Sequence, residues 1–142
     1  MTPATTSSPE DSPARSRRGL VILDHGARDD AANSQLAALA DAIARQRPGW
    51  LVRHAHMELA EPDLDQAIDS LVRSGVSEIF VHLHFLGSGF HVRESIPELV
   101  DTARIRHPGI EIETSDPLGD DPLLADIVLA RLDARTGRGE NT

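Results

Sequence analysis

Three residues that could do chemistry each follow a short apolar stretch of the chain: His25, Glu58 and His91. Two imidazoles and a carboxylate can bind a divalent cation and leave positions open for a substrate. They can equally transfer protons, because histidine titrates close to neutral pH. We therefore expect one site for metal binding or proton transfer. The ordinary alternatives are that His25 caps a turn beside Gly26 and that Glu58 is a helix-dipole partner.

Two arginines lie in the same loops as these histidines. Arg28 follows His25, and Arg93 follows His91. A guanidinium group binds a carboxylate through two parallel hydrogen bonds, so both arginines are candidates for holding an acidic substrate. Ordinary surface salt bridges are their alternative role. Ser88, in the loop before His91, is a further candidate for substrate binding.

Four other histidines form two pairs, His54 with His56 and His82 with His84. Alternate residues of a strand point to the same face of a sheet, so both imidazoles of a pair share one face. Such a pair could bind a metal ion. We expect hydrogen-bonded structural roles under a covering helix instead, with His84, nearest the end of its strand, as the exception.

The residue types that are absent narrow the chemistry. The chain of 142 residues has no cysteine and no tyrosine, and its basic residues are all arginine. Disulfides, thiolate catalysis and lysine Schiff bases are therefore excluded. The net charge of −9 argues against a nucleic-acid partner. No apolar run approaches the ~18 residues of a membrane helix, and residues 1–19 lack the apolar centre of a signal peptide, so we expect a cytoplasmic protein with no membrane partner.

Short apolar runs alternate with helical patterns from Leu20 onward. The predicted strands are residues 20–26, 51–57, the run beginning at Glu78, and 110–114. Parallel strands need crossover connections, so this rhythm predicts an α/β fold: a single three-layer domain with a parallel four-stranded sheet and helices on both faces, flavodoxin-like in type. The expected organisation is a disordered tail over 1–18, the domain over 19–134 and a disordered tail over 135–142.

Capping and periodicity signals place several helix features. We expect Asp29 or Asp30 to cap the first helix and Pro62 to lie in the first turn of the second. The segment from Ser95 to Glu98 has the form of a capping box for the third helix. In the last helix Leu124, Ile127 and Val128 are expected to face inward.

Four motifs resemble, in order and spacing, the short-form class II tetrapyrrole chelatases, the CbiX-like sirohydrochlorin cobaltochelatases and ferrochelatases. They are HGARDDAAN (25–33), MELAEPDLDQAI (57–68), HFLGSGFHVRESIPEL (84–99) and PLGDDPLL (117–124). The resemblance covers roughly residues 20–132. Its most specific part is the third motif.

The resemblance implies a lyase that inserts Co2+ or Fe2+ into sirohydrochlorin for cobalamin or sirohaem synthesis, with the metal as substrate and no organic cofactor. It implies that His25 and His91 bind the incoming metal and accept the pyrrole protons, and that Glu58 assists them. The arginines of the site loops become stronger candidates, because the tetrapyrrole carries many carboxylates. Short forms of the family pair into homodimers with the site in the cleft, so a homodimer is expected.

The first motif departs from the family pattern. The family commonly has Gly-His-Gly-Ser, whereas this chain has Asp24-His25-Gly26-Ala27. Ala27 has no hydroxyl to donate, and Asp24 could raise the basicity of His25 or bind metal itself. A non-catalytic tetrapyrrole- or metal-binding protein on the same fold is therefore the alternative function. A third hypothesis is an interaction domain with structural histidines.

Overall fold

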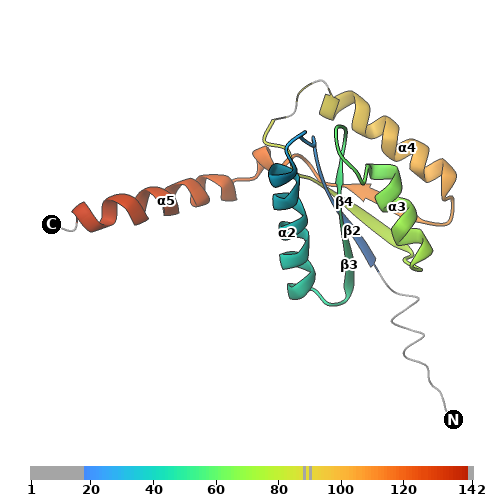
Figure 1. The fold of residues 1–142 in the computed structure, drawn as a ribbon, viewed down its shortest axis with the longest axis horizontal. Helices are drawn as coiled ribbons and strands as arrows, with labels where there is room; N and C mark the ends of the chain where they lie inside the picture. The colour runs from blue at the N-terminus through green and yellow to red at the C-terminus, as the bar shows by residue number, and fades with distance from the viewer. Residues whose placement is uncertain (1–17, 88, 90, 141–142) are drawn as a thin grey trace, which may run out of the picture.

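The protein is described here by a computed structural model that covers residues 18–87, 89 and 91–140. Four parallel strands form one sheet in the order β3-β2-β4-β5 (Figure 1). The strands are β2 (Arg18–Asp24), β3 (Trp50–His56), β4 (Glu78–Leu83) and β5 (Glu111–Thr114). The predicted parallel four-stranded sheet is confirmed.

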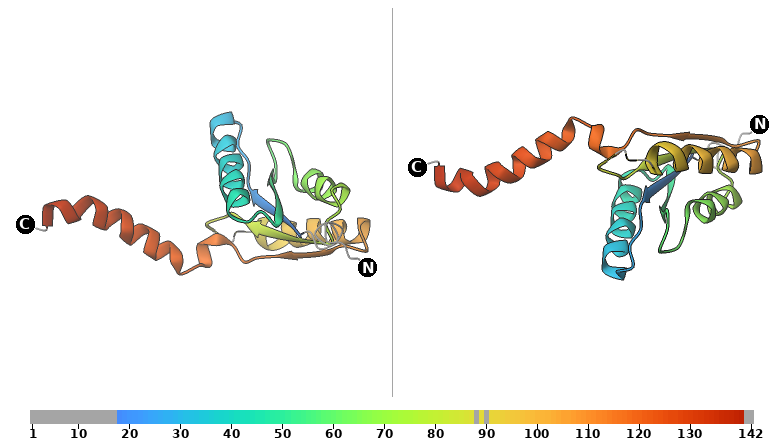
Figure 2. Two further views of the ribbon diagram at one scale, coloured as in Figure 1. Left: turned by 90° about the horizontal axis from the view of Figure 1, so that it is seen from below. Right: turned by 90° about the horizontal axis from the view of Figure 1, so that it is seen from above.

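Four helices and two short turns connect and follow these strands. They are α2 (Asp30–Gln46), α3 (Leu64–Arg73), the π-helical turn η1 (His91–Ser95), α4 (Ile96–Arg106), the 3-10 turn η2 (Leu118–Asp120) and α5 (Leu123–Glu140). Figures 1 and 2 show α2 on one side of the sheet and α3 with α4 on the other, as a three-layer α/β domain requires. Within the described residues, no helix is both long and apolar enough to span a bilayer.

The first three strands are neighbours, with β2 in the middle. Asp24 pairs with His56 of β3, and Leu23 pairs with Leu83 of β4. Because all strands are parallel, the loops that leave them meet at one edge of the sheet. The strand order reverses beside β2, so this edge is where an open α/β sheet binds its ligands.

The two faces of the sheet are packed differently. We call the face that packs on α3 and α4 the covered face; its Val21 and Val81 are 0% exposed, as is Leu71 of α3. The opposite face, which carries Leu20, Ile22, Phe80 and His82, is called the open face. Helix α2 covers part of it through a small cluster around Ile22, Leu36 and Ala40.

The starts of α2 and α3 are fixed by aspartate caps. Asp29 accepts a hydrogen bond from the Ala31 N–H at 3.0 Å, as predicted for the first helix. Asp63 and Gln66 form a capping box at the start of α3, with both bonds 2.8 Å long. The prediction that Pro62 lies in the first turn of this helix is wrong, because Pro62 precedes the cap residue.

The predicted capping box at Ser95 is also wrong. Ser95 has a helical backbone and its side chain does not cap α4. The reason is that η1 begins at His91 and runs directly into α4, so α4 has no separate start at Ser95. The connection after β4 is therefore shorter than the sequence suggested, ending near His91.

Helix α5 differs most from expectation. It projects away from the domain in every view (Figures 1 and 2), and Ile127 and Val128 are 46% and 63% exposed. The prediction that these two residues face inward is therefore wrong, whereas Leu124 is half-buried. The helix also continues to Glu140, past Arg135, where a disordered tail was expected to begin.

Candidate active site

Backbone hydrogen bonds bring His25 and Glu58 to the same edge of the sheet. The Met57 N–H donates to the Asp24 carbonyl at 2.9 Å, and the Glu58 N–H donates to the His25 carbonyl at 3.0 Å. The β2–β3 ladder thus continues beyond the formal ends of both strands. Both residues are exposed there.

Gly26 permits this close approach. Its φ is +92°, and a Cβ placed on it would lie 2.0 Å from the Glu58 carbonyl oxygen and 2.9 Å from the His56 Cβ. A side chain is excluded twice, by the backbone conformation and by the neighbouring main chain. The glycine after His25 is therefore needed to hold the first two loops together.

The third loop contributes an aromatic support for His25. Phe85, 3% exposed, lies just after β4, and its ring meets the His25 ring edge to face with centroids 4.5 Å apart. The His84 N–H donates to the Leu23 carbonyl at 2.8 Å, so this strand also pairs with β2 beyond its formal end. The loops after β2, β3 and β4 therefore meet at His25.

Only some of the remaining candidate residues in the loop after β4 lie within the described part of the chain. Ser88 and the side chain of His91 lie outside the described residues. The backbone of His91 begins η1, and the exposed Arg93 in that turn donates its N–H to the Gly89 carbonyl at 3.1 Å. The structure thus places the start of this turn after the loop that leaves β4.

Arg28 stands in a loop held by a residue that the sequence did not single out. Asn33, in the first turns of α2, accepts from the Ala27 N–H at 3.0 Å and donates to the Ala27 carbonyl at 2.7 Å. This pair of bonds fixes the loop without any side-chain oxygen on residue 27. The exposed Arg28 lines a shallow hollow together with His54 and Glu61.

Asp24 has a partner that its position in the chain did not reveal. Its Oδ1 lies 2.7 Å from Nδ1 of His56, which is only 1% exposed. The sequence leaves open that Asp24 raises the basicity of His25 or binds metal itself. Its hydrogen bond goes to the residue opposite it in the parallel register.

The two histidine pairs lie on the open face and contact each other within each pair. Nε2 of His82 is 3.2 Å from Nδ1 of His84, and the rings of His54 and His56 have centroids 5.6 Å apart. Burial lowers the pKa of His82, and the charge of His84 lowers it further. Burial also lowers the pKa of His54, and the charge of His56 lowers it further. Both are therefore neutral at pH 7.

No group of three or more histidine and carboxylate side chains is arranged as a complete metal site within the residues that are described. His25 and Glu58 lie at the edge of the sheet to which the loop after β4 also leads.

The protein is a parallel α/β protein with exposed histidine and glutamate residues at the carboxyl edge of its sheet. The family model described as CbiX matches residues 19–135. The chain belongs to the CbiX family, which confirms the resemblance seen in the motifs.

Named relatives give the comparison more detail. The chain is 35% identical over 115 residues to a chloroplastic sirohydrochlorin ferrochelatase of Arabidopsis thaliana, covering 80% of this chain and 51% of that protein. It is 31% identical over 121 residues to a sirohydrochlorin cobaltochelatase of Methanosarcina barkeri, covering 80% of this chain and 93% of that protein. The chain therefore spans about half of the plant relative and nearly all of the archaeal one.

A solved structure supports the fold. The crystal structure of a cobalamin (vitamin B12) biosynthesis CbiX protein from Marinobacter aquaeolei VT8 superposes with a TM-score of 0.74 at 26% identity. The match covers 85% of this chain and 98% of the other. The α/β architecture described above is therefore that of the CbiX family.

Proposed function

We propose that this protein is a sirohydrochlorin metal chelatase, which inserts Co2+ or Fe2+ into the macrocycle in cobalamin or sirohaem biosynthesis. Family membership and the names of the two relatives support this reaction. The metal ion is a substrate, and the proposal includes no organic cofactor. Cobalt and iron both suit imidazole and carboxylate ligands, so the residues do not choose between them.

In the proposed reaction His25 and His91 bind the incoming metal and accept the pyrrole protons that it displaces, with Glu58 assisting. The observation that carries this assignment is the hydrogen bond from the Glu58 N–H to the His25 carbonyl, 3.0 Å long. It brings the backbones of two exposed residues, one with an imidazole and one with a carboxylate side chain, to the same edge of the sheet. A neutral imidazole can serve as ligand or as proton acceptor at pH 7.

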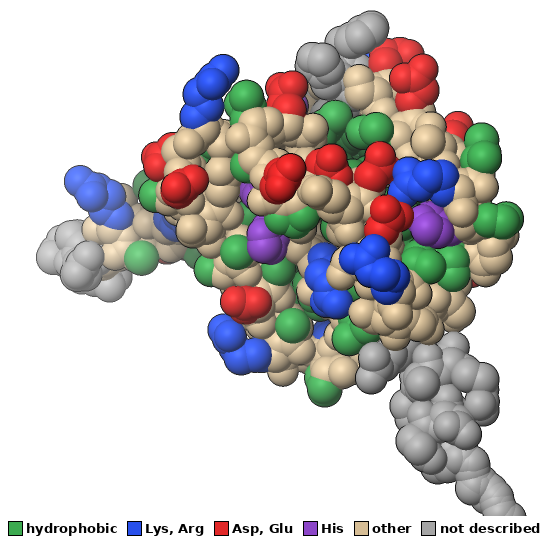
Figure 3. All heavy atoms as spheres, turned by 45° about the vertical axis from the view of Figure 1, so that its right-hand side comes forward, with side chains coloured by type: hydrophobic (Ala, Val, Ile, Leu, Met, Phe, Trp, Pro, Cys, Tyr) green, Lys and Arg blue, Asp and Glu red, His purple; other side chains and the backbone are tan. Residues whose placement is uncertain are grey.

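Substrate binding is assigned to Arg28, Ser88 and Arg93. The protein carries a net charge of −9, and acidic side chains with interspersed arginines are spread over the face drawn in Figure 3. A macrocycle with many carboxylates needs local positive charge to approach such a surface. Exposed arginines in the two site loops supply it.

The proposal includes two further features. The protein acts as a homodimer with the macrocycle bound in the cleft between the subunits, and it is located in the cytoplasm. The resemblance to the short-form chelatases, which pair into homodimers, supports the first of these features.

The test follows the visible spectrum of sirohydrochlorin after addition of Co2+ or Fe2+. We expect the wild type to accelerate insertion and His25→Ala or His91→Ala to lose about 10²–10⁴-fold of that rate, the usual contribution of a proton-accepting side chain. His107→Ala is the matched control, because His107 follows α4 and its Nε2 bonds to Asp69, 2.8 Å away, remote from the site. A wild type no faster than the uncatalysed reaction rules out the enzyme.

One observation favours the second candidate, a non-catalytic tetrapyrrole- or metal-binding protein. Ala27 offers no hydroxyl in the first motif, and Asn33 supports that loop through the backbone alone. A carrier of this kind would retain coloured macrocycle during purification and would not accelerate metal insertion. An active wild type with fully active His25→Ala and His91→Ala variants would leave the enzyme in place and refute only the assigned residues.

A further inference from the structure

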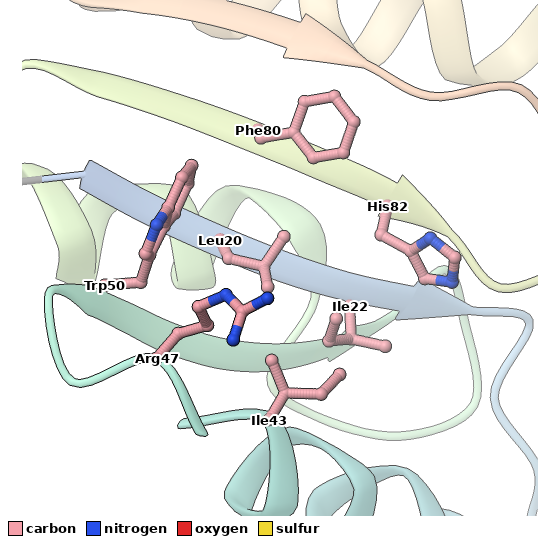
Figure 4. Close-up of a pocket in the computed structure, with 7 residues that line it drawn as sticks. All are labelled: Leu20, Ile22, Ile43, Arg47, Trp50, Phe80 and His82. Carbon is pink, nitrogen blue, oxygen red and sulfur yellow. The ribbon is translucent and has the colours of Figure 1, made fainter. Parts of the chain in front are cut away.

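The histidine pair at the end of β4 has no role in the proposed reaction. His82 and His84 lie on the open face of the sheet, two positions apart, and both are half-buried. His82 lines a groove of about 530 Å3 on this face, whose walls are largely apolar. Figure 4 shows His82 at one end of the groove, beside the carboxyl end of β4, and Trp50 at the other end. The pair can therefore be reached from solvent.

The two ring nitrogens are separated by the distance that a chelated metal ion requires. Nε2 of His82 lies 3.2 Å from Nδ1 of His84. A divalent transition metal such as zinc binds imidazole nitrogen at about 2.0–2.1 Å, so two nitrogens in neighbouring coordination positions, about 90–110° apart, are separated by about 2.8–3.4 Å. An ion can therefore bind both nitrogens without any movement of the backbone.

A small rotation of the rings would direct both nitrogens at one ion. The two rings are inclined at 54°, with centroids 5.4 Å apart, and the facing nitrogens now share a hydrogen bond. The terminal torsion of a histidine side chain has a broad energy well, so this rotation costs little. One of the two nitrogens carries the hydrogen of the present bond. On metal binding that ring moves its proton to its other nitrogen through water, and both rings stay neutral.

The environment of His82 favours the form that binds metal. Burial lowers the pKa of this imidazole, and the charge of His84 lowers it further. A metal ion must compete with protons for a ring nitrogen, and this competition is weak for a histidine that is already neutral. The side chain therefore needs no deprotonation at pH 7 before it can act as a ligand.

An acidic hollow adjoins His82 and would attract a cation to the pair. It has a volume of about 380 Å3, and its titratable lining residues are His82, Asp116, Asp120 and Asp121. The segment that carries the aspartates is fixed beside the end of β4. The Leu83 N–H donates to Ser115 Oγ at 3.0 Å, and the Gly119 N–H donates to the Phe85 carbonyl at 3.0 Å. Carboxylates held at this place raise the local concentration of divalent cations.

The other histidine pair is not suited to this role. Nδ1 of His56 lies 2.7 Å from the Asp24 carboxylate, and the His56 side chain is 1% exposed. An ion bound there would have to break a buried hydrogen bond, at a cost of about 1–3 kcal/mol. His54, on the same face and also half-buried, therefore serves as a matched control for His82.

We propose that His82 and His84 form a second binding site for a divalent transition-metal ion, held by Nε2 of His82 and Nδ1 of His84 with water in the remaining positions. A site with two protein ligands agrees with the finding that, among the described residues, no three histidine or carboxylate side chains form a complete metal site. Imidazole ligands select cobalt, nickel, copper or zinc over Mg2+ and Ca2+, which prefer oxygen. The site is separate from the residues proposed to insert the metal, and it does not depend on the chelatase reaction.

The first test is isothermal titration with Ni2+ at pH 7.5, using the full chain without an affinity tag. The chain carries His25→Ala and His91→Ala, which remove two of the proposed catalytic ligands. We expect one Ni2+ per chain. Adding His82→Gln or His84→Gln should weaken binding by at least about tenfold, because loss of even an outer partner of a metal site typically costs about 10–100-fold in affinity. His54→Gln is the control and should retain the affinity. Far-UV circular dichroism verifies that each variant is folded.

The second test identifies the ligand atoms directly. Cu2+ is bound to the same His25→Ala/His91→Ala chain, and its electron paramagnetic resonance spectrum is recorded. We expect nitrogen hyperfine splitting from two imidazoles, and from one imidazole after His84→Gln. An excess of Mg2+ should leave the Ni2+ affinity unchanged, because Mg2+ does not compete for imidazole nitrogen.

Each contrary outcome overturns the site. Absence of Ni2+ binding removes it outright, and unchanged affinity in both His82→Gln and His84→Gln means that the ion binds elsewhere. An equal loss in His54→Gln contradicts the assignment to the β4 pair. Displacement by Mg2+ identifies a carboxylate site instead. The spectral assay of the wild type decides the proposed chelatase function independently of all these results.

Discussion

The two faces of one sheet differ in how much of their apolar surface is packed. On the covered face α3 and α4 bury residues from all four strands in a single cluster that includes Val21, Val81 and Leu71. On the open face α2 covers β3 and part of β2, and Phe80 of β4 is left half-buried. The covered face therefore stabilises each subunit, and the open face has apolar surface available for a partner.

The difference also shows where the sequence predicts well. The apolar residues of α3 recur at helical spacing on one side, and Leu64, Ala67, Ile68 and Leu71 are all buried as expected. Those of α5 lie on two sides, so the pattern cannot say which side is inward. Apolar residues on one side of a helix predict which side is buried, whereas apolar residues on all sides predict only that the helix is buried.

The largest expected effect compares one leucine from each face. Leu71→Ala should lower the free energy of unfolding by about 2–5 kcal/mol, because it empties a fully buried site on the covered face. Leu20→Ala, half-buried on the open face, should cost less, about 1 kcal/mol, since the truncated side chain still borders a groove. Urea unfolding measures both. Equal losses would mean that the open face is packed as tightly as the covered one.

A smaller effect is expected at the carboxyl edge of the open face. Asp24→Ala removes the acceptor 2.7 Å from the buried His56, and an unsatisfied buried polar group costs about 1–3 kcal/mol. The control is Asp101→Ala, which breaks an exposed pair with Arg104 and should cost under about 1 kcal/mol. Thermal or urea unfolding of the two variants should rank them in that order. If Asp101→Ala costs as much, the buried bond has no special role.

The smallest effect is a dependence on pH that belongs to the open face. The pKa of His82 is lowered from 6.5 by burial and by His84, so below about pH 6.5 the unfolded chain binds a proton that the folded protein does not. Stability should therefore be fully present above that pH and decline as the pH falls. The groups near His82 are His84, Arg47 and the carboxylates of Asp116, Asp120 and Asp121.

His82→Leu should make the decline in unfolding free energy between pH 7.5 and pH 5.5 shallower than in the wild type. Urea unfolding at the two pH values measures it. Phe80→Leu, on the same face without a titratable group, should retain the wild-type slope. A wild-type slope in His82→Leu would show that this imidazole does not contribute.

The strands and three of the helices were predictable because they depend on local periodicity. The approach of the His25 and Glu58 backbones depends on β2 and β3 being neighbours, which local periodicity does not fix. The pairing of Asp24 with His56 was not predictable, because it depends on the register between two strands far apart in the sequence. The role of Asn33 could not be predicted from the sequence for a similar reason, since its bonds to Ala27 form only when the loop folds back on α2.

Two local errors had physical causes that the residues could have revealed. Asp63 and Gln66 have capping-box spacing, and this signal was stronger than the preference of Pro62 for a first helical turn. At Ser95 the same kind of signal was present, but the preceding residues were already helical. A capping pattern predicts a helix start only where the chain before it is extended.

Gly26 sets a limit on how this sequence can vary. Every other L-amino acid carries the Cβ that would lie 2.0 Å from the Glu58 carbonyl, so the smallest replacement fails for the same reason as the largest. Tolerance at this position is therefore independent of side-chain size, charge or polarity. A substitution at His25 or Glu58 leaves the backbone of both loops in place, whereas a substitution at Gly26 forces that backbone to change.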